Sequence, residues 1–267
     1  MPQIGCKCPV CTSSDPRDRR RRCGAYVTSE KVAFLIDTPP EMRLACIEYG
    51  VERVDAICLT HAHMDHVAGF DDVRRFNTIN GGVPMRCFAM PETIDQMHNI
   101  FPYISDKKNA MGLFRPMINF VSNEKPFMIG DVAAERLEVE HSFPCCGYMF
   151  REQGTGNGEQ VTGNREQGTG NRGQGSVAYI SDCHEIPEAT LKKLEGVDVL
   201  ILNCLRERFH PTHLNLEASL AYIDRIKPGR AYLVHMCHDL SHKDYLSKLP
   251  KGVEPAYDGL EIDIRKG

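Results

Sequence analysis

The amino-acid sequence predicts an α/β fold, because short apolar runs of strand length alternate with segments of helical spacing. The ranges expected to form strands are 32–37, 54–59, 85–89, 127–129, 134–139, 177–180, 197–202 and 231–234. The ranges expected to form helices are 41–49, 65–76, a segment from about 91, and 216–226. Several strands are followed directly by a histidine or an aspartate, and open α/β sheets build their sites at the carboxyl ends of strands. We therefore expect a functional site at one sheet edge.

The first predicted elements lead into a cluster of histidines. Residues 32–37 form an apolar run that Asp-Thr-Pro-Pro ends, and residues 41–49 place apolar side chains at helical intervals. The apolar strand at 54–59 then delivers the chain into the run Thr-His-Ala-His-Met-Asp-His. From Asp65 to Phe76 apolar residues recur at helical spacing, so Asp65 is expected at the N-cap of a helix.

Residues 152–172 break this pattern with three tandem heptads, EQGTGNG, EQVTGNR and EQGTGNR. They contain almost nothing that a core could bury, and their glycines make ordering costly. We expect a single domain over residues 1–267 that carries a flexible low-complexity insertion at 152–175. The insertion would lie at the tip of a hairpin between residues 147–151 and 176–180, and a functional lid is the alternative interpretation.

The overall charge and hydropathy limit the classes of partner. A formal charge of −4 and a pI near 6.3 argue against a general nucleic-acid binder, although they leave a small phosphate ester open as substrate. No apolar run approaches the roughly 18 residues that a membrane span needs. The first residues lack the basic and apolar regions of a signal peptide. We expect a cytoplasmic protein without membrane contact, and a homodimer stays open as its assembly state.

The motif H-x-H-x-D-H predicts a metal site with two ions. In an extended turn His61 and His63 point the same way and can bind one metal, whereas Asp65 and His66 lie further along and can bind a second. Imidazole nitrogen and carboxylate oxygen are ligands that zinc, manganese and iron prefer. The alternative is a polar loop that is rich in histidine by chance.

Three later strand ends supply further candidate ligands. His141 follows the strand at 134–139, Asp182 follows 177–180, and His235 follows 231–234. Each residue by itself is more often an anchor for its loop. As a set after the H-x-H-x-D-H motif, they favour a dinuclear site for divalent manganese or zinc.

Cysteine and arginine clusters mark the N-terminal segment. Cys6, Cys8 and Cys11 form a C-x-C-x-x-C pattern, which in a reducing compartment favours zinc binding over a disulfide, with three free thiols as the alternative. Cys58 and Cys204 lie in apolar runs and are expected to pack as small hydrophobic side chains. The four consecutive arginines at 19–22 are interpreted as a solvated loop face, with phosphate or RNA binding as the alternative.

The order of these motifs resembles the metallo-β-lactamase superfamily, in its metallohydrolase and phosphodiesterase branch. The resemblance implies an αββα four-layer sandwich with two metals at one edge. It assigns His61, His63 and His141 to the first metal. It assigns Asp65, His66 and His235 to the second metal, with Asp182 as the bridge between the two. An aspartate at the bridging position favours phosphoester chemistry.

A closer resemblance is to the PhnP group of phosphoribosyl cyclic phosphodiesterases. It rests on residues 4–11, 14–19 and 256–260 and covers nearly the whole chain except 152–175. The resemblance implies a structural zinc held by Cys6, Cys8, Cys11 and His238. Members of this group begin with a strand ahead of the cysteine cluster, so either the translation start is misplaced or a neighbouring strand is an exposed edge.

The resemblance also implies an active-site histidine that does not bind metal. His213 matches it by its position before His235, whereas His210 is a rival on sequence alone and a capping or surface role is the alternative. The implied enzyme is a metal-dependent phosphodiesterase of the EC 3.1.4 type that hydrolyses a small phosphodiester, cyclic on a ribose. A hydroxide activated by two divalent metals would attack phosphorus, Asp65 would orient it, and His213 would protonate the leaving group.

Two other functions stay open at this stage. One is an RNA-processing nuclease of the tRNA 3′-processing type, which the acidic pI and the lack of an evident basic arm disfavour. The other is a non-hydrolytic metal protein that resembles the pyrroloquinoline-quinone biogenesis factor PqqB, whose relatives share the cysteine cluster. The complete set of candidate ligands in this chain disfavours that function.

Overall fold

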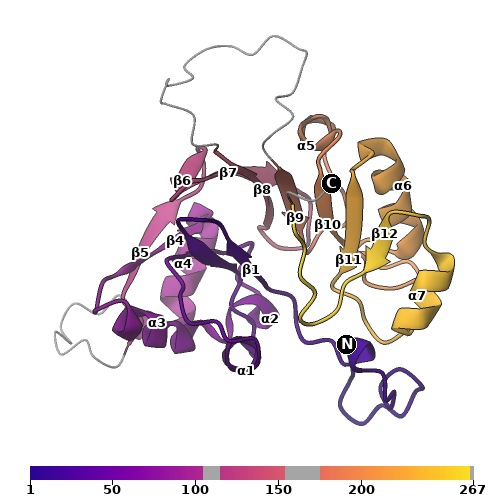
Figure 1. The fold of residues 1–267 in the computed structure, drawn as a ribbon, viewed down its shortest axis with the longest axis horizontal. Helices are drawn as coiled ribbons and strands as arrows, with labels where there is room; N and C mark the ends of the chain where they lie inside the picture. The colour runs from indigo at the N-terminus through magenta and orange to yellow at the C-terminus, as the bar shows by residue number, and fades with distance from the viewer. Residues whose placement is uncertain (105–114, 154–174, 265–267) are drawn as a thin grey trace.

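The first half of the chain builds a five-stranded sheet. The structure, a computed structural model, describes residues 1–104, 115–153 and 175–264. The sheet has the order β1-β2-β3-β4-β5, in which β1 and β2 are antiparallel and the other neighbours are parallel (Figure 1). Its strands are β1 (Ala25–Thr28), β2 (Ala33–Ile36), β3 (Ala56–Cys58), β4 (Met85–Ala89) and β5 (Ile118–Ser122).

The second half builds a seven-stranded sheet with the order β12-β11-β10-β9-β8-β7-β6. Strands β9 to β12 run parallel, and β6 to β9 pair antiparallel. The strands are β6 (Phe127–Ile129), β7 (Val132–Glu138), β8 (Cys146–Glu152), β9 (Ser176–Ile180), β10 (Val199–Asn203), β11 (Arg230–Val234) and β12 (Val253–Pro255).

The helices lie with the sheet that their own half of the chain forms, as Figure 1 shows. Those of the first half are α1 (Met42–Glu48), α2 (Met64–Val67), α3 (Arg74–Ile79) and α4 (Pro91–Ile100). Those of the second half are α5 (Glu188–Leu194), α6 (Leu216–Ile226) and α7 (His242–Lys248). Short 3₁₀ turns occur at Pro16–Asp18, Phe70–Val73 and Pro102–Ile104. Within the described residues, no helix combines the length and the apolar character that a membrane span requires.

Three separate apolar cores define the layers. In β2, Leu35 packs with the helices of the first half, whereas Phe34 and Ile36 face the opposite sheet. In β8, Phe150 faces Phe34 across the two sheets at a ring distance of 5.1 Å, and Met149 points to the helices of the second half. Strand side chains alternate between faces, so each sheet contributes to two cores. The expected αββα four-layer sandwich is therefore confirmed.

The single helix expected over residues 65–76 is wrong, because the segment is broken at Gly69. The helix α2 ends at Val67, a 3₁₀ turn follows, and α3 begins at Arg74. Gly69 donates its N–H to Thr38 O, and a Cβ at Gly69 would lie 2.3 Å from Pro39 O. The close approach of these two backbones forces the break. The N-cap of α2 is accordingly His63 and not Asp65, which lies inside the first turn.

Most predicted strands and helices are found within two residues of their expected bounds. The structure adds β1, β5 and β12, which are short, and the helices α5 and α7. The expected hairpin is confirmed, since β8 pairs antiparallel with β9 and Arg151 lies opposite Ser176. The flexible insertion that we expect at its tip lies almost wholly outside the described residues.

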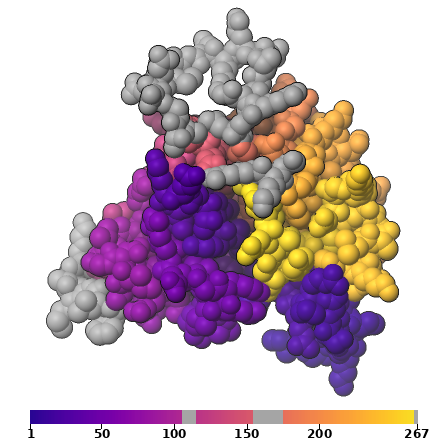
Figure 2. All heavy atoms as spheres, in the orientation of Figure 1, coloured from indigo at the N-terminus to yellow at the C-terminus, as the bar shows by residue number. Residues whose placement is uncertain are grey.

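The arginine run at 19–22 ties the N-terminal segment to both halves of the molecule. Its interpretation as a solvated face holds for Arg19 and Arg22, which are exposed, and is wrong for Arg20, which is buried. Arg20 is 6% exposed and donates from Nε to Ala256 O at 2.8 Å, in the C-terminal half. Arg21 and Arg22 form ion pairs with Glu48 and Glu41 at the two ends of α1. The chain then continues into β1, while residues 1–18 form a knob beside the C-terminal half (Figure 2).

We expect Arg20→Met to lower the free energy of unfolding by about 2–4 kcal/mol, because it leaves Asp18 buried without a nearby positive charge and frees Ala256 O. Arg19→Met is the matched control, since Arg19 is exposed and such a substitution usually changes stability by less than about 0.5 kcal/mol. Urea denaturation of both variants measures the difference. Equal midpoints would show that Arg20 is not an anchor.

Candidate metal centre

The carboxyl ends of four strands bring together all seven side chains that the sequence predicts for the dinuclear site. His61 and His63 follow β3, and Asp65 and His66 lie in α2 directly after them. His141 follows β7, Asp182 follows β9, and His235 follows β11. The ligand atoms within each group lie within 4.8 Å of one another, and the groups are His61/His63/His141, His61/His66/Asp182 and Asp65/His66/His235. Their role as metal ligands stays a prediction.

The first group consists of three imidazoles, each of which has one nitrogen that faces the other two rings. His61 Nε2 lies 2.9 Å from His63 Nδ1, which is close enough for both to bind one ion. Burial lowers the pKa of His61 and His63 and brings the pKa of His141 to about 4. These imidazoles are therefore neutral at pH 7, and neutral imidazole is the form that binds a metal.

The second group surrounds Asp182, which is 2% exposed. His66 Nε2 lies 3.1 Å from Asp182 Oδ2, and His235 Nε2 lies 3.1 Å from Asp182 Oδ1 and 3.4 Å from Asp65 Oδ2. Burial opposes a charge on His66, but the carboxylates of Asp182 and Asp37 outweigh it and raise the pKa of this imidazole. The centre of this group therefore attracts positive charge.

Asp37 is a buried support of the site that the sequence analysis missed. It accepts hydrogen bonds from the backbone N–H and the hydroxyl of Thr60, both at 2.8 Å, and lies 2.8 Å from His66 Nδ1. A carboxylate on the outer nitrogen of a metal-binding histidine fixes the ring orientation and makes the inner nitrogen a better ligand. The available signal was its position at the end of the apolar run at 32–37.

Among the described residues, several buried polar atoms at the centre make no hydrogen bond, although two of them, His66 Nε2 and Asp182 Oδ2, lie 3.1 Å apart as an ion pair. They are atoms that a metal would satisfy. The atoms are His66 Nε2, His141 Nε2 and Asp182 Oδ2. Such atoms cost free energy unless something binds them. The donors are imidazole nitrogens and carboxylate oxygens, which suit divalent zinc or manganese. The residues therefore fit a pair of divalent cations.

His213 lies beside the centre, on the loop between β10 and α6. Its Nε2 lies 3.1 Å from Asp182 Oδ1, its ring stacks on that of His235, and its side chain is 14% exposed. His210, the rival on sequence, faces the outer nitrogen of His213 and not Asp182. His213 also forms a possible ligand group with His141 and Asp182. Metal analysis of a His213 variant therefore distinguishes a general acid from a metal ligand.

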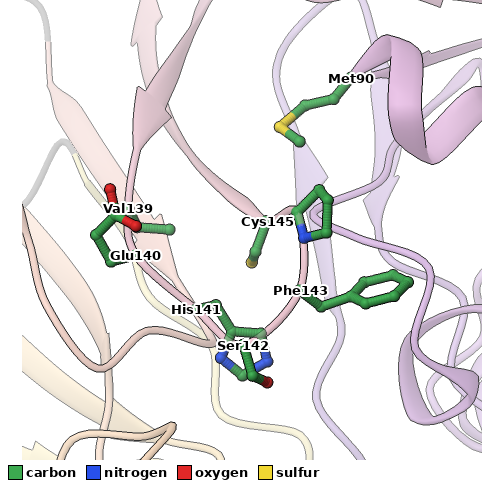
Figure 3. A pocket seen from close by; sticks show the side chains of 8 residues that line it. Met90, Val139, Glu140, His141, Ser142, Phe143 and Cys145 are labelled. Carbon is green, nitrogen blue, oxygen red and sulfur yellow. The ribbon is translucent and has the colours of Figure 1, made fainter.

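A pocket of about 320 Å³ adjoins His141, as Figure 3 shows. Met90 and Cys145 line it with their sulfur atoms, together with Val139 and Phe143. The Phe143 ring stacks on His63 at 4.7 Å, which connects the pocket wall to the first ligand group. The pocket is thus large enough for a small organic group next to the metal centre.

A second cluster joins the N-terminal segment to the chain beyond β11. The Sγ atoms of Cys6, Cys8 and Cys11 each lie 3.4 Å from His238 Nδ1. Tetrahedral zinc with bonds of about 2.3 Å to sulfur and 2.0 Å to nitrogen requires separations of about 3.5 Å. The Cys11 backbone N–H, helped by His238, lowers the pKa of Cys8 to about 6, which favours the thiolate that zinc binds.

The remaining cysteines take part in packing. All twelve cysteines of the chain lie in the described residues, and none of them is paired in a disulfide. Cys58 and Cys204 are fully buried in apolar cores, as predicted. Cys23 Sγ accepts the backbone N–H of His235 at 3.1 Å, so this thiol supports the loop that carries a candidate ligand.

Comparisons with known proteins agree with this fold. The model of the beta-lactamase superfamily domain matches residues 33–236. A solved structure described as a new diphosphatase from the PhnP family is 32% identical, with a TM-score of 0.81, over 97% of this chain and 90% of that one.

Curated relatives match only through part of their own length. An octanoyltransferase of Porphyromonas gingivalis is 29% identical over 268 residues, which cover 99% of this chain and 49% of that protein. A ribonuclease Z of Clostridium tetani is 27% identical over 146 residues, which cover 51% of this chain and 46% of that protein. The chain thus spans about half the length of these relatives.

The cysteine cluster predicts that Cys8→Ser loses one zinc per chain and melts at a lower temperature, because metal binding in a closed site contributes directly to folding free energy. Cys46→Ser is the control, since Cys46 is a half-buried thiol outside both clusters. Elemental analysis and thermal unfolding of the purified variants measure the two effects. An unchanged zinc content in Cys8→Ser would refute the assignment of this cluster.

Proposed function

The chain belongs to the β-lactamase superfamily and, within it, to the PhnP family, and on this premise we propose that it is a dinuclear metal-dependent phosphodiesterase. Proteins of the superfamily generally bind divalent metals such as zinc, and the named relatives include a diphosphatase and a ribonuclease Z. The chain is accordingly a hydrolase in our interpretation, and the bond that it cleaves is a phosphoester of a small molecule.

The proposal rests on one observation: buried nitrogen and oxygen atoms that make no hydrogen bond among the described residues lie close together around Asp182. His61, His63 and His141 would hold one cation, Asp65, His66 and His235 the other, and Asp182 would contact both. A bound pair of divalent cations supplies a water of pKa near 7 and neutralises charge on phosphoryl oxygens. All of these donors are nitrogen or oxygen atoms, which suits phosphoester chemistry with zinc or manganese.

His213 is the proposed general acid. Its Nε2 lies 3.1 Å from Asp182 Oδ1, and a carboxylate oxygen can only accept, so Nε2 carries a proton in this contact. The proton therefore points into the site. An alkoxide leaving group departs readily only when a positioned acid protonates it, and such an acid contributes about 10²–10⁴-fold.

A small substrate is favoured over RNA. Arg20, Arg21 and Arg22, the most basic run of the sequence, are engaged in contacts within the protein and do not form a free basic surface. The ribonuclease Z relatives match only about half of the chain. A cyclic ribose phosphate is the first substrate class that we propose, and a diphosphate is the second, since the solved PhnP-family relative is described as a diphosphatase.

A substrate panel tests the proposed reaction. Metal-free protein is reloaded with manganese or zinc and is assayed on ribose cyclic phosphates, linear dialkyl phosphodiesters, a dinucleotide and a diphosphate. We expect metal-dependent hydrolysis that is fastest on the small cyclic diester. If only the diphosphate is hydrolysed, the enzyme is a diphosphatase and not a phosphodiesterase. If metal-loaded protein hydrolyses none of these substrates, the proposal is refuted.

The acid role predicts a loss that depends on the leaving group. His213→Gln should keep its metal content, lose about 10²–10⁴-fold in kcat on alkyl diesters and lose little on p-nitrophenyl diesters, because p-nitrophenolate leaves without a proton. Asp182→Ala is the contrasting variant and should lose metal and activity together. If kcat of His213→Gln falls equally on both esters, His213 acts in substrate binding. If the variant loses a metal ion, His213 is a metal ligand.

A further inference from the structure

A further buried polar cluster joins the N-terminal segment to α7. Asp18 and Arg20 belong to the N-terminal segment, and His242 is the first residue of α7. These three side chains belong to residues that are 3%, 6% and 4% exposed. Arg20 Nη2 lies 3.3 Å from His242 Nδ1, and Asp18 Oδ1 accepts the backbone N–H of His242 at 2.6 Å. The two segments thus meet at a buried imidazole.

The contact between Arg20 and His242 has only one possible direction. A guanidinium carries donors alone and stays charged, so His242 Nδ1 accepts its hydrogen bond and is unprotonated. The imidazole is therefore neutral in this contact. Protonation of the ring would place a hydrogen on Nδ1, which removes the acceptor and puts a second positive charge 3.3 Å from the guanidinium. The contact is incompatible with a protonated His242.

The carboxylates around His242 already accept hydrogen bonds from other groups. Asp15 accepts from the Arg17 guanidinium, and Asp18 accepts from the backbone of His242 itself. On α7, Asp244 accepts from the hydroxyl of the N-cap Ser241. The other charged or titratable groups next to the cluster are Arg17 on the N-terminal segment, Lys243 and Tyr245 on α7, and Tyr257 and Asp258 on the C-terminal loop.

The surroundings of His242 oppose a positive charge on its ring. Burial lowers the pKa of His242 most, the charges of Arg20 and Arg17 lower it further, and the carboxylates of Asp15 and Asp18 do not outweigh them. A solvated histidine has a pKa near 6.5, so a state in which the N-terminal segment has left His242 takes up a proton more readily. The docked state is therefore favoured at neutral pH and loses stability as the pH falls below about 6.5.

The segment that this contact holds also carries the three thiols of the cysteine cluster. Their partner His238 lies shortly before His242 in the chain. Arg20 makes a second contact with the C-terminal half, because its Nε donates to Ala256 O at 2.8 Å. Figure 2 shows the start of the chain as a knob beside that half. Loss of the contact between Arg20 and His242 would weaken the attachment of the knob and of its thiols.

We propose that Arg20 and His242 form a pH-sensitive latch, which holds residues 1–22 against the C-terminal half at neutral pH and releases them when His242 takes up a proton. This inference goes beyond the proposed function, because it concerns the docking of the N-terminal segment and no step of the reaction. The proton comes from the solvent and binds His242 Nδ1, and no covalent bond breaks. The released segment takes its thiols away from His238, so acid also speeds the loss of an ion from the cysteine cluster.

His242→Gln tests the latch, because glutamine keeps an acceptor for Arg20 and does not titrate. His98→Gln is the matched control, since His98 is a half-buried histidine of α4, outside the dinuclear site and the cysteine cluster. Zinc-loaded proteins undergo hydrogen exchange between about pH 7.5 and about pH 5.5, with rates corrected for the intrinsic effect of pH. The backbone N–H of Arg21 donates to the Asp258 carboxylate and therefore reports the docking of the segment directly.

We expect the opening constant of residues 12–22 to rise over this pH range by about five- to tenfold more in the wild type than in His242→Gln. The reason is that uptake of one proton changes such a constant by at most about tenfold per pH unit. His98→Gln should follow the wild type. At about pH 5.5, transfer of zinc from the cysteine cluster to a coloured chelator should be slower in His242→Gln than in the wild type by a similar factor.

NMR titration of the wild-type histidine rings gives a second measurement that needs no variant to fold. The His242 ring should take up its proton at a pH below 6.5, together with the loss of protection in residues 12–22. The inference is overturned if His242→Gln loses protection in acid as the wild type does. It is equally overturned if the wild-type ring of His242 becomes protonated while the N-terminal segment stays protected.

Discussion

The buried carboxylate of Asp37 is the contact on which the metal centre depends most. It joins the end of β2 to Thr60 at the end of β3 and to His66 in α2. The backbone adds to this junction, because Asp37 N donates to Cys58 O and Thr38 N donates to His66 O. A single residue thereby fixes the entry and exit of the segment that carries four candidate ligands. Asp37 adopts a φ of 60°, a conformation that aspartate tolerates better than most residues.

The same region explains why the chain after the motif cannot form one regular helix. The Thr38–Pro39 backbone, held by Asp37, approaches Gly69 so closely that no side chain fits there. His66 is thus held by Asp37 and Thr38, which follow β2 of the first sheet. Asp182, which follows β9 of the second sheet, contacts the other nitrogen of the same ring. The centre forms only where the two sheets meet, so its geometry is a property of their packing and not of the motif alone.

The sequence was sufficient for the fold class, for most strands and for the residues that meet at the site. Apolar runs buried on both faces, as in β2 and β3, are easy to identify, and the spacing of His61 to His66 is rarely accidental. The break at Gly69 and the burial of Arg20 were not predictable in this way. Both depend on segments that are distant in sequence, Pro39 in one case and Ala256 in the other, and local periodicity contains no information about them.

The cluster of Cys6, Cys8, Cys11 and His238 joins two distant parts of the sequence, since Cys6 and His238 are separated by 232 positions. During synthesis the three thiols leave the ribosome well before their fourth partner is made, because 232 positions separate Cys6 from His238. The ring that a bound ion would close is therefore the longest that these residues allow, and closing such a ring removes more freedom from an unfolded chain than closing a short one. Assembly of this cluster must wait until residue 238 has been made, and a truncated product that ends before residue 238 cannot complete it.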